Sequence, residues 1–249
     1  LLLAAVVIGA IGIIIGVLLG IAREKFKVEV DEKEILVRAE LPGNNCGGCG
    51  FPGCDGLAAA IAAGTAPVNG CPVGGAPVAD KIAAIMGVES GSSEKKVAFV
   101  KCKGTCDKTN VKYNYYGITD CSMVTVAPGS GEKACAYGCM GYGSCVKACQ
   151  FAAIHVVDGV AVVDKEKCVA CGKCVATCPK GLIELVPYKA EHLVQCSSHD
   201  KGPAVKKVCT AGCIGCTLCT KQCEFDAIHM ENNVAVIDYE KCTNCGACR

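Results

Sequence analysis

The first 22 residues of the chain form one apolar run. No charged side chain occurs between Leu1 and Ala22. As a helix that rises 1.5 Å per residue, this run is about 33 Å long, enough to cross the hydrocarbon core of a bilayer. Arg23, Lys25 and Lys27 follow it directly. The pattern predicts a single-pass membrane helix over residues 1–22 in contact with lipid, and the positive-inside rule places the bulk of the chain on the cytoplasmic side.

Short apolar runs alternate with turn residues further along the chain. Two pairs of runs predict β-hairpins, the first turning at Asp158-Gly159 and the second at Asn232-Asn233. We also expect two short strands in the charged segment after residue 22, and an Ala-rich helix that ends near Gly64. The strands are expected at residues 28–30, 35–37, 154–157, 160–163, 228–230 and 234–237, and the helix at residues 55–63.

These elements divide the chain into successive segments. A Ser-, Gly- and Lys-rich stretch at residues 90–96 has the composition of a linker. The expected boundaries are 1–22 for the membrane helix, 23–41 for a connector, 42–89 for a small domain, 97–190 for a first module with a Cys-rich lead-in, and 191–249 for a second module.

Cysteine dominates the composition. The 249 residues include 24 Cys and no Trp, and the formal net charge is +1. This charge excludes a nucleic-acid partner bound through overall positive charge. Small modules with few aromatic residues need cross-links in addition to a hydrophobic core. Because we expect the cysteines to lie in the reducing cytoplasm, metal ligation is favoured over disulfides.

The segment between residues 42 and 89 carries a compact cysteine motif. Cys46, Cys49, Cys54 and Cys71 follow the spacing C-x2-C-x4-C-x16-C, with glycines between the first three. Several sulfur ligands must converge on one point to hold a [4Fe-4S] cluster, and glycine permits the tight loops that this requires. The motif therefore predicts an iron–sulfur site. Four thiolates also suit zinc, which is the alternative.

The later part of the chain carries the bacterial ferredoxin spacing C-x2-C-x2-C-x3-C, in which the fourth cysteine binds the other cluster of a pair. Pro179 follows one copy and Glu224 follows the next. The fourth cysteine of a third copy would fall three residues beyond Arg249, so we expect the sequence to be truncated. The copies are Cys168, Cys171, Cys174 and Cys178; Cys213, Cys216, Cys219 and Cys223; and Cys242, Cys245 and Cys248.

An internal repeat relates these motifs. A shift of 74 residues carries Cys168 onto Cys242 and the stretch 160–164 onto 234–238. Such a repeat predicts a duplicated module. The predicted fold class is α+β, with one N-terminal transmembrane helix, a small Cys-rich 4Fe-4S domain and two tandem ferredoxin-like modules of β-α-β-β-α-β order.

One position departs from the repeat. Tyr142 stands where the second copy has Cys216, so the first module lacks one ligand. We expect Cys135 to replace it; a three-iron cluster is the alternative. The expected clusters are held by Cys135, Cys139, Cys145 and Cys178; by Cys149, Cys168, Cys171 and Cys174; by Cys223, Cys242, Cys245 and Cys248; and by Cys213, Cys216 and Cys219 with a partner outside this sequence.

Five cysteines fall outside these motifs. Cys121 and Cys196 stand 14 and 13 residues before Cys135 and Cys209, which makes them candidate repeat counterparts. Ligands of another cluster, plain thiols and a redox pair remain as alternatives for the group. Its members are Cys102, Cys106, Cys121, Cys196 and Cys209.

The order of segments resembles the B subunit of the Rnf complex. A membrane helix, the C-x2-C-x4-C-x16-C motif and tandem ferredoxin motifs occur in this order, and the stretch CAYGCMGYGSC at 135–145 is similar to that subunit in anaerobic bacteria. The resemblance implies a subunit of a translocase, a ferredoxin:NAD⁺ oxidoreductase of the bacterial cytoplasmic membrane that couples electron flow to Na⁺ or H⁺ transport. It implies electron transfer from reduced ferredoxin to the membrane subunits through several [4Fe-4S] clusters, about five here.

The same resemblance implies that the flavins and the NAD site belong to other Rnf subunits, the expected partners besides soluble ferredoxin. The sequence shows no catalytic triad, nucleotide loop or flavin motif, and His155 and His229 lie one repeat apart, which favours a structural role. Six lysines between residues 95 and 112 form either a docking surface for an acidic ferredoxin or a solvated face. Two other functions remain: an electron-transfer subunit of another membrane oxidoreductase, and a zinc-structured, membrane-tethered interaction module.

Overall fold

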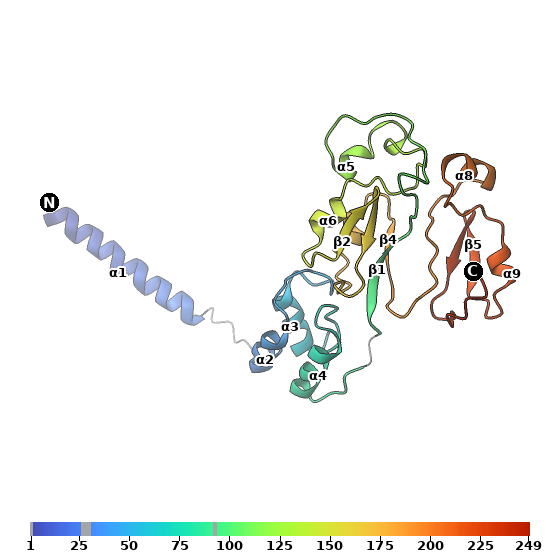
Figure 1. Ribbon diagram of the computed structural model, residues 1–249. Coiled ribbons are helices and arrows are strands. Elements are labelled where there is room, and N and C mark those ends of the chain that lie inside the picture. Colours follow the sequence, from blue (N-terminus) through green and yellow to red (C-terminus); the bar gives the residue numbers. More distant parts are fainter. Residues whose placement is uncertain (1, 26–30, 92–93) are drawn as a thin grey trace.

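The computed structural model describes residues 2–25, 31–91 and 94–249. Within them the chain mixes helices and strands, and the strands form three two-stranded sheets. Figure 1 shows a helical unit between residues 32 and 86, followed by two strand-containing modules that lie next to each other.

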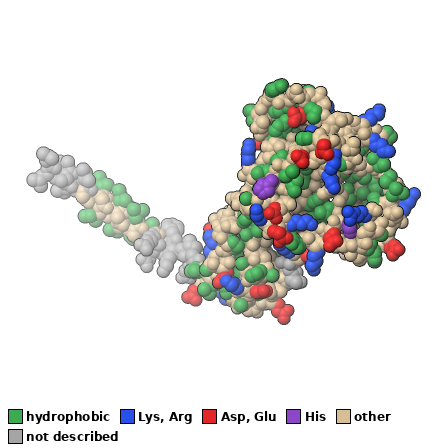
Figure 2. Space-filling view, in the orientation of Figure 1, with side chains coloured by type: hydrophobic (Ala, Val, Ile, Leu, Met, Phe, Trp, Pro, Cys, Tyr) green, Lys and Arg blue, Asp and Glu red, His purple; other side chains and the backbone are tan. Residues whose placement is uncertain are grey.

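The first helix, α1 (Leu2–Lys25), spans 24 residues and covers the apolar run. Large apolar side chains between Ile11 and Ile21 are exposed on it, and Figure 2 shows them along its described part. In the part of the chain that the structure describes, no helix is both long enough and apolar enough to cross a membrane, so the predicted membrane span is not confirmed.

Three helices build the small domain that follows: α2 (Glu32–Glu40), α3 (Cys54–Ala62) and α4 (Gly75–Met86). Leu57 and Ile61 of α3 pack against Val37 of α2 and Ile82 of α4, and all four are at most 1% exposed. Full burial of each Leu or Ile side chain contributes about 1.5–3 kcal/mol. The second half of the expected connector 23–41 therefore belongs to the core of this domain.

The strand expected at residues 35–37 is wrong, because these residues lie within α2. The Asp31 carboxylate caps the helix by accepting a hydrogen bond from the Lys33 N–H at 2.9 Å, and acidic residues in the first turn suit the positive end of the helix dipole. The strand expected at residues 28–30 lies outside the described residues. The helix expected at 55–63 is confirmed as α3, and Gly64 follows it with φ of +72°.

The first module pairs strand β1 (Lys96–Val100) with β4 (Ile183–Pro187), antiparallel, with Val97 opposite Val186. Between them the chain forms α6 (Ser144–Ala148), the hairpin β2 (Ile154–Val157) and β3 (Val160–Val163), and α7 (Lys173–Thr177). The first predicted hairpin is confirmed, with Ile154 opposite Val163. Val97, Ile154 and Val186 form the centre of the buried core.

A long lead-in separates β1 from α6. It contains the short helix α5 (Cys121–Val124) and the single-turn 3₁₀ helix η1 (Pro128–Ser130). An antiparallel bridge between Val111 and Lys133 brings two distant parts of the lead-in together. The lead-in thus brings residues far from the ferredoxin motifs back to the first module, where it forms the lobe around α5 in Figure 1.

The second module contains α8 (Gly202–Val208), α9 (Leu218–Lys221) and the hairpin β5 (Ile228–Glu231) and β6 (Val234–Ile237). The hairpin is the second that the sequence predicts, and Ile228 lies opposite Ile237. Outer strands equivalent to β1 and β4 do not occur among the described residues of this module, so a second complete β-α-β-β-α-β unit is not confirmed.

The 74-residue repeat gives the two modules equivalent hydrogen bonds. The Asp164 N–H donates to the Ala153 carbonyl at 2.7 Å, and the equivalent Asp238 N–H donates to the Ala227 carbonyl at 2.8 Å. The Ala153 and Ala227 N–H groups each donate to a cysteine sulfur at 3.4 Å. Equivalent cysteines, Cys149 and Cys223, therefore accept hydrogen bonds from equivalent backbone groups just before the two hairpins.

Candidate metal centres

The four cysteines of the first motif line one cavity, which we call site 1 (Cys46, Cys49, Cys54 and Cys71). The Cys54 N–H at the start of α3 donates to Asn45 Oδ1 at 2.8 Å, and the Gly74 N–H donates to Cys71 Sγ at 3.4 Å. Gly47, at φ of +72°, makes the turn between the first two ligands. The structure thus brings together the set that the sequence predicts for the small domain.

A second cavity, site 2, collects Cys149, Cys168, Cys171 and Cys174. It is the crossed set expected for the first module, because Cys149 comes from the end of α6 while the other three surround the start of α7. The Ala98 N–H of β1 donates to Cys168 Sγ at 3.3 Å. Burial raises the pKa of the Cys174 thiol to about 11, and neighbouring sulfurs add to this shift.

The third cavity, site 3, differs from the expected set in one member. Cys139, Cys145 and Cys178 line it as expected, but Cys121 stands in the place predicted for Cys135. Burial raises the pKa of the Cys145 thiol to about 12, and the nearby sulfurs of Cys139, Cys121 and Cys178 raise it further. The sequence placed Cys121 only among possible ligands of another cluster, and not in this set.

Local contacts explain how Cys121 reaches site 3. The Ser144 hydroxyl, at the start of α6, donates to the Asp120 carboxylate at 2.9 Å and accepts a hydrogen bond from the Cys121 N–H at 2.8 Å. These bonds hold the start of α5 against α6. Tyr142 instead stacks edge-on against Tyr115, with 5.7 Å between the ring centroids. No signal in the sequence spacing distinguishes Cys121 from Cys135, because both precede the motif.

Cys135 lines a separate cavity together with three of the cysteines that no motif includes. We call it the bridging cavity, defined by Cys102, Cys135, Cys196 and Cys209. Cys121 and Cys196, considered above as repeat counterparts, therefore line different cavities. Cys106, the remaining unassigned cysteine, is exposed.

The cysteines of the second module also gather around its hairpin. Burial raises the pKa of the Cys248 thiol, and the nearby sulfurs of Cys242, Cys223 and Cys245 raise it further. These four form the expected crossed set, which we call site 4. The pKa of Cys219 is raised in the same way, by burial and by the neighbouring sulfurs of Cys213 and Cys216.

The donor sets determine which group these sites suit. Across the described residues, no three His, Cys, Asp or Glu side chains are placed to hold a single metal ion. Sites 1, 2 and 3 each present four thiols around a cavity, together with backbone N–H groups directed at sulfur. Thiolates with N–H···S hydrogen bonds are the surroundings of iron–sulfur clusters. The raised pKa values of Cys145 and Cys174 keep these thiols neutral without metal, and metal binding deprotonates them.

Neighbouring sites lie close to each other. Gly48 of site 1 lies against the backbone of Cys171 of site 2, so closely that a Cβ atom on Gly48 would lie 2.6 Å from the Cys171 carbonyl oxygen. The sulfur of Cys174 of site 2 lies near enough to Cys145 of site 3 to raise the pKa of its thiol, after burial and nearer sulfurs. The three sites thus form a continuous series.

Family models match both kinds of motif. One described as "Putative Fe-S cluster" matches residues 41–73, which include all of site 1. Another described as "4Fe-4S binding domain" matches residues 161–184, which include three cysteines of site 2.

Curated relatives match nearly the whole chain. The B subunit of the Na(+)-translocating ferredoxin:NAD(+) oxidoreductase complex of Acetobacterium woodii is 50% identical over 243 residues, which cover 97% of this chain and 73% of that protein. The B subunit of the ion-translocating oxidoreductase complex of Methanosarcina acetivorans is 45% identical, over 97% of this chain and 92% of that protein. The proton-translocating counterpart of Clostridium ljungdahlii is 41% identical, over 96% of this chain and 85% of that protein.

Proposed function

The chain belongs to the family of B subunits of ion-translocating ferredoxin:NAD(+) oxidoreductase complexes, the Rnf complexes, and we propose from this premise that it is their iron–sulfur electron-transfer subunit. It accepts electrons from reduced ferredoxin and relays them through [4Fe-4S] clusters to the membrane subunits, and the electrons finally reach NAD⁺. The NAD site lies on other subunits of the complex.

The observation that carries this proposal is the series of cysteine-lined cavities that lie close together. Sites 1, 2 and 3 adjoin through Gly48, Cys171, Cys174 and Cys145. Electron hopping requires clusters that are close to one another, whereas clusters that only cross-link separate modules need no contact between them. The protein tunes the reduction potentials of the clusters by burying the thiolates and by directing N–H groups at them.

The cavities support three of the proposed ligand sets, and neighbouring sulfurs support the two sets of the second module. Cys46, Cys49, Cys54 and Cys71 hold one cluster, and Cys149, Cys168, Cys171 and Cys174 hold the next. Cys121 completes a four-iron site with Cys139, Cys145 and Cys178, which leaves no need for a three-iron cluster there. In the second module, Cys223, Cys242, Cys245 and Cys248 hold another cluster, and Cys213, Cys216 and Cys219 contribute to a further one.

Activity of the assembled complex tests the relay. In a Cys49→Ser variant we expect ferredoxin:NAD⁺ activity to fall to background while the clusters of the other sites remain. Cys106→Ser is the matched control, because Cys106 is exposed and lines none of the described cavities. If the Cys49→Ser complex retains full activity, site 1 is not in the relay.

Direct reduction tests the donor. Reduced ferredoxin, mixed anaerobically with the purified chain, is expected to produce the EPR signals of reduced four-iron clusters. Of the six lysines that form the basic stretch, Lys101 pairs with Glu184 at 3.0 Å and Lys95 lies over the Tyr188 ring. Replacing the exposed Lys103 by Glu is therefore the variant that perturbs docking without breaking either contact. An unchanged reduction rate in low salt would exclude Lys103 from the docking surface.

Membrane attachment through residues 1–22 is part of the same proposal. It rests on the uncharged sequence and on the exposed apolar side chains of α1. A single pass in the bacterial cytoplasmic membrane, with residues 31–249 in the cytoplasm, keeps the clusters reduced and accessible to ferredoxin. Deletion of residues 1–22 is expected to release the chain from carbonate-washed membranes, and release of the undeleted chain by the same wash would contradict the anchor.

A further inference from the structure

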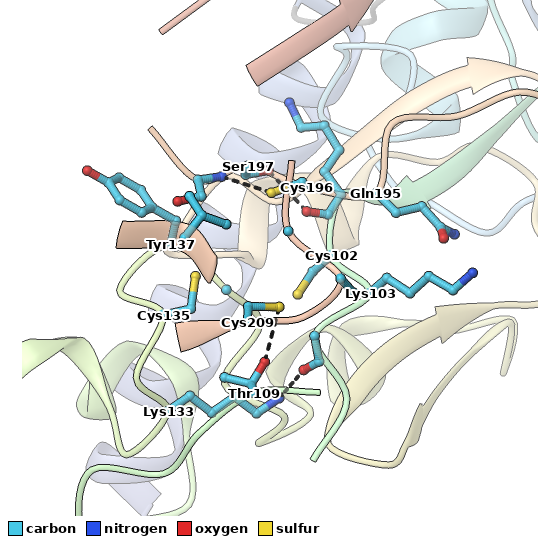
Figure 3. A pocket seen from close by; sticks show the side chains of 17 residues that line it. Cys102, Lys103, Thr109, Lys133, Cys135, Tyr137, Gln195, Cys196, Ser197 and Cys209 are labelled. Atoms are coloured by element: carbon cyan, nitrogen blue, oxygen red, sulfur yellow. Dashed lines mark hydrogen bonds between the residues drawn. The ribbon is translucent and has the colours of Figure 1, made fainter. Parts of the chain in front are cut away.

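The bridging cavity collects four cysteines that no sequence motif connects. Cys102 follows β1, Cys135 lies in the lead-in, Cys196 follows β4 and Cys209 ends α8. In Figure 3 the four cysteine side chains lie around one cavity. The space left unfilled is about 400 Å³, partly open to solvent, against about 320 Å³ for site 2 and about 420 Å³ for site 3.

Two glycines show how close the sulfurs are. A Cβ atom on Gly104 would lie 3.5 Å from Cys209 Sγ and 3.6 Å from Cys102 Sγ, so these sulfurs are separated by at most the sum of the two distances. A Cβ atom on Gly138 would likewise lie 3.5 Å from Cys135 Sγ and 3.7 Å from Cys102 Sγ. Glycine at both positions leaves the space among the sulfurs open.

Polar hydrogens are directed at the sulfurs. The Cys139 N–H donates to Cys102 Sγ at 3.4 Å, the Ser198 N–H donates to Cys196 Sγ at 3.4 Å, and the Thr109 hydroxyl donates to Cys209 Sγ at 3.6 Å. Such donors stabilise thiolates rather than neutral thiols. The arrangement repeats the one found at sites 1 and 2.

Two lysines supply positive charge beside the cavity. Lys133 is 7% exposed and lines the wall, and its Nζ donates to the carbonyls of Gly104 at 3.0 Å and Gly159 at 2.6 Å. Lys180 is half-buried and donates to the Gly138 carbonyl at 3.1 Å. A cluster held by four thiolates carries net negative charge, and a buried cation nearby offsets the cost of burying it.

The position of the cavity gives it a place in the relay. The N–H that reaches Cys102 Sγ belongs to Cys139, which lines site 3. On the other side, the cavity is lined by Ala211 and Gly212, which directly precede Cys213 of the second module. A backbone ladder between 108–110 and 208–210 holds the two modules together at this point, with the Asn110 N–H donating to the Val208 carbonyl at 3.1 Å.

We propose that Cys102, Cys135, Cys196 and Cys209 hold an additional [4Fe-4S] cluster that joins site 3 to the clusters of the second module. The cluster takes up one electron from one neighbour and passes one electron to the other, so it returns to its starting oxidation state with each transfer. This inference rests on the proposed electron-transfer function, because it extends the same relay.

Iron analysis of variants tests the inference. We would purify the full chain anaerobically, together with Cys102→Ala, Cys196→Ala and the double variant, and measure iron, acid-labile sulfide and zinc per chain. Each of the three is expected to lose about four irons and four sulfides relative to the parent, with no further loss in the double variant. Cys106→Ala is the matched control, expected to keep the parent's iron. If the parent holds no iron, the proposed function fails; if the parent holds iron and the variants keep all of it, only this inference fails.

A second measurement on the parent needs no variant and covers the case in which a variant misfolds and loses all of its iron. Iron-loaded parent is treated with iodoacetamide under reducing conditions, before and after iron chelation, and each cysteine is followed by mass spectrometry. Cys102, Cys135, Cys196 and Cys209 are expected to react only after chelation, whereas Cys106 reacts before it. Reaction of the four at the rate of Cys106 in the loaded protein, or zinc in place of about four irons, would overturn the inference.

Discussion

A side chain at Gly48 should separate the small N-terminal domain from the first module. In the structure, Gly48 packs on the backbone of Cys171, and an added Cβ atom would lie 2.6 Å from the carbonyl oxygen and 3.0 Å from the Cα atom. Ordinary contact begins near 3.4 Å, so the loop must retreat by about 0.8 Å. The obstacle is backbone, which cannot rotate away. Gly48→Ala is therefore expected to weaken the contact between sites 1 and 2 while leaving every cysteine in place.

The magnitude follows from overpacking, which costs about 1–3 kcal/mol. A loss in the lower part of this range, about 1–2 kcal/mol, corresponds to a change of about 5–30-fold in the equilibrium between docked and separated domains.

Hydrogen exchange measured by mass spectrometry reads this equilibrium locally. In Gly48→Ala, the segments 46–50 and 169–172 are expected to exchange about 5–30-fold faster, while the core around Leu57 and Ile82 and the iron content stay unchanged. Gly91→Ala is the control, because Gly91 is exposed and a Cβ atom added there would meet only the flexible side-chain amide of Asn69, at 3.3 Å. Unchanged exchange in both segments of Gly48→Ala would refute the contact and, with it, the junction between sites 1 and 2.

Three further predictions concern the clusters and the core. Cys121→Ser is expected to remove the cluster of site 3, with loss of about four irons per chain. A variant that keeps its iron would indicate that Cys135, and not Cys121, is the fourth ligand. The Ile154 side chain is 2% exposed in the first module, so Ile154→Ala is expected to lower the free energy of unfolding by about 2–5 kcal/mol. Anaerobic denaturant titrations measure this loss, and a loss below about 1 kcal/mol would show that the core tolerates the cavity. Chelation of iron under reducing conditions is expected to abolish the cooperative unfolding transition of the modules, because their cores are too small to fold without metal; a transition that survives unchanged would show that the cores suffice.

The sequence determined the features that depend on neighbouring residues. Both hairpins form where apolar runs meet turn residues, because alternation and turn chemistry act over a few positions. The clustering of Cys46, Cys49 and Cys54 follows from their spacing in the same way. The equivalent surroundings of Cys149 and Cys223 follow from the repeat, because equal sequences form equal local structure. These features can be derived without knowing how the modules pack.

Only the tertiary structure decided the features that depend on the path of the chain. The short apolar run at 35–37 allowed a strand, and packing of Val37 against α3 and α4 made this run part of a helix. The choice between Cys121 and Cys135 depends on the fold of the lead-in, where hydrogen bonds between Asp120, Ser144 and Cys121 direct one of two similar cysteines into site 3.

The bridging cavity is the clearest example of a feature that only the tertiary structure decided. Its cysteines come from four segments of the chain, and their spacing in sequence matches no motif. They meet because the chain, after β4 has paired with β1, returns to the end of β1, where the Ser197 hydroxyl donates to the Lys101 carbonyl at 3.1 Å, and because the lead-in pairs with the end of α8. Each of these pairings joins residues that are about 80 to 100 positions apart. Spacing motifs record only ligands that a local loop brings together, so a site assembled by long-range pairing leaves no pattern in the sequence and appears only in the fold.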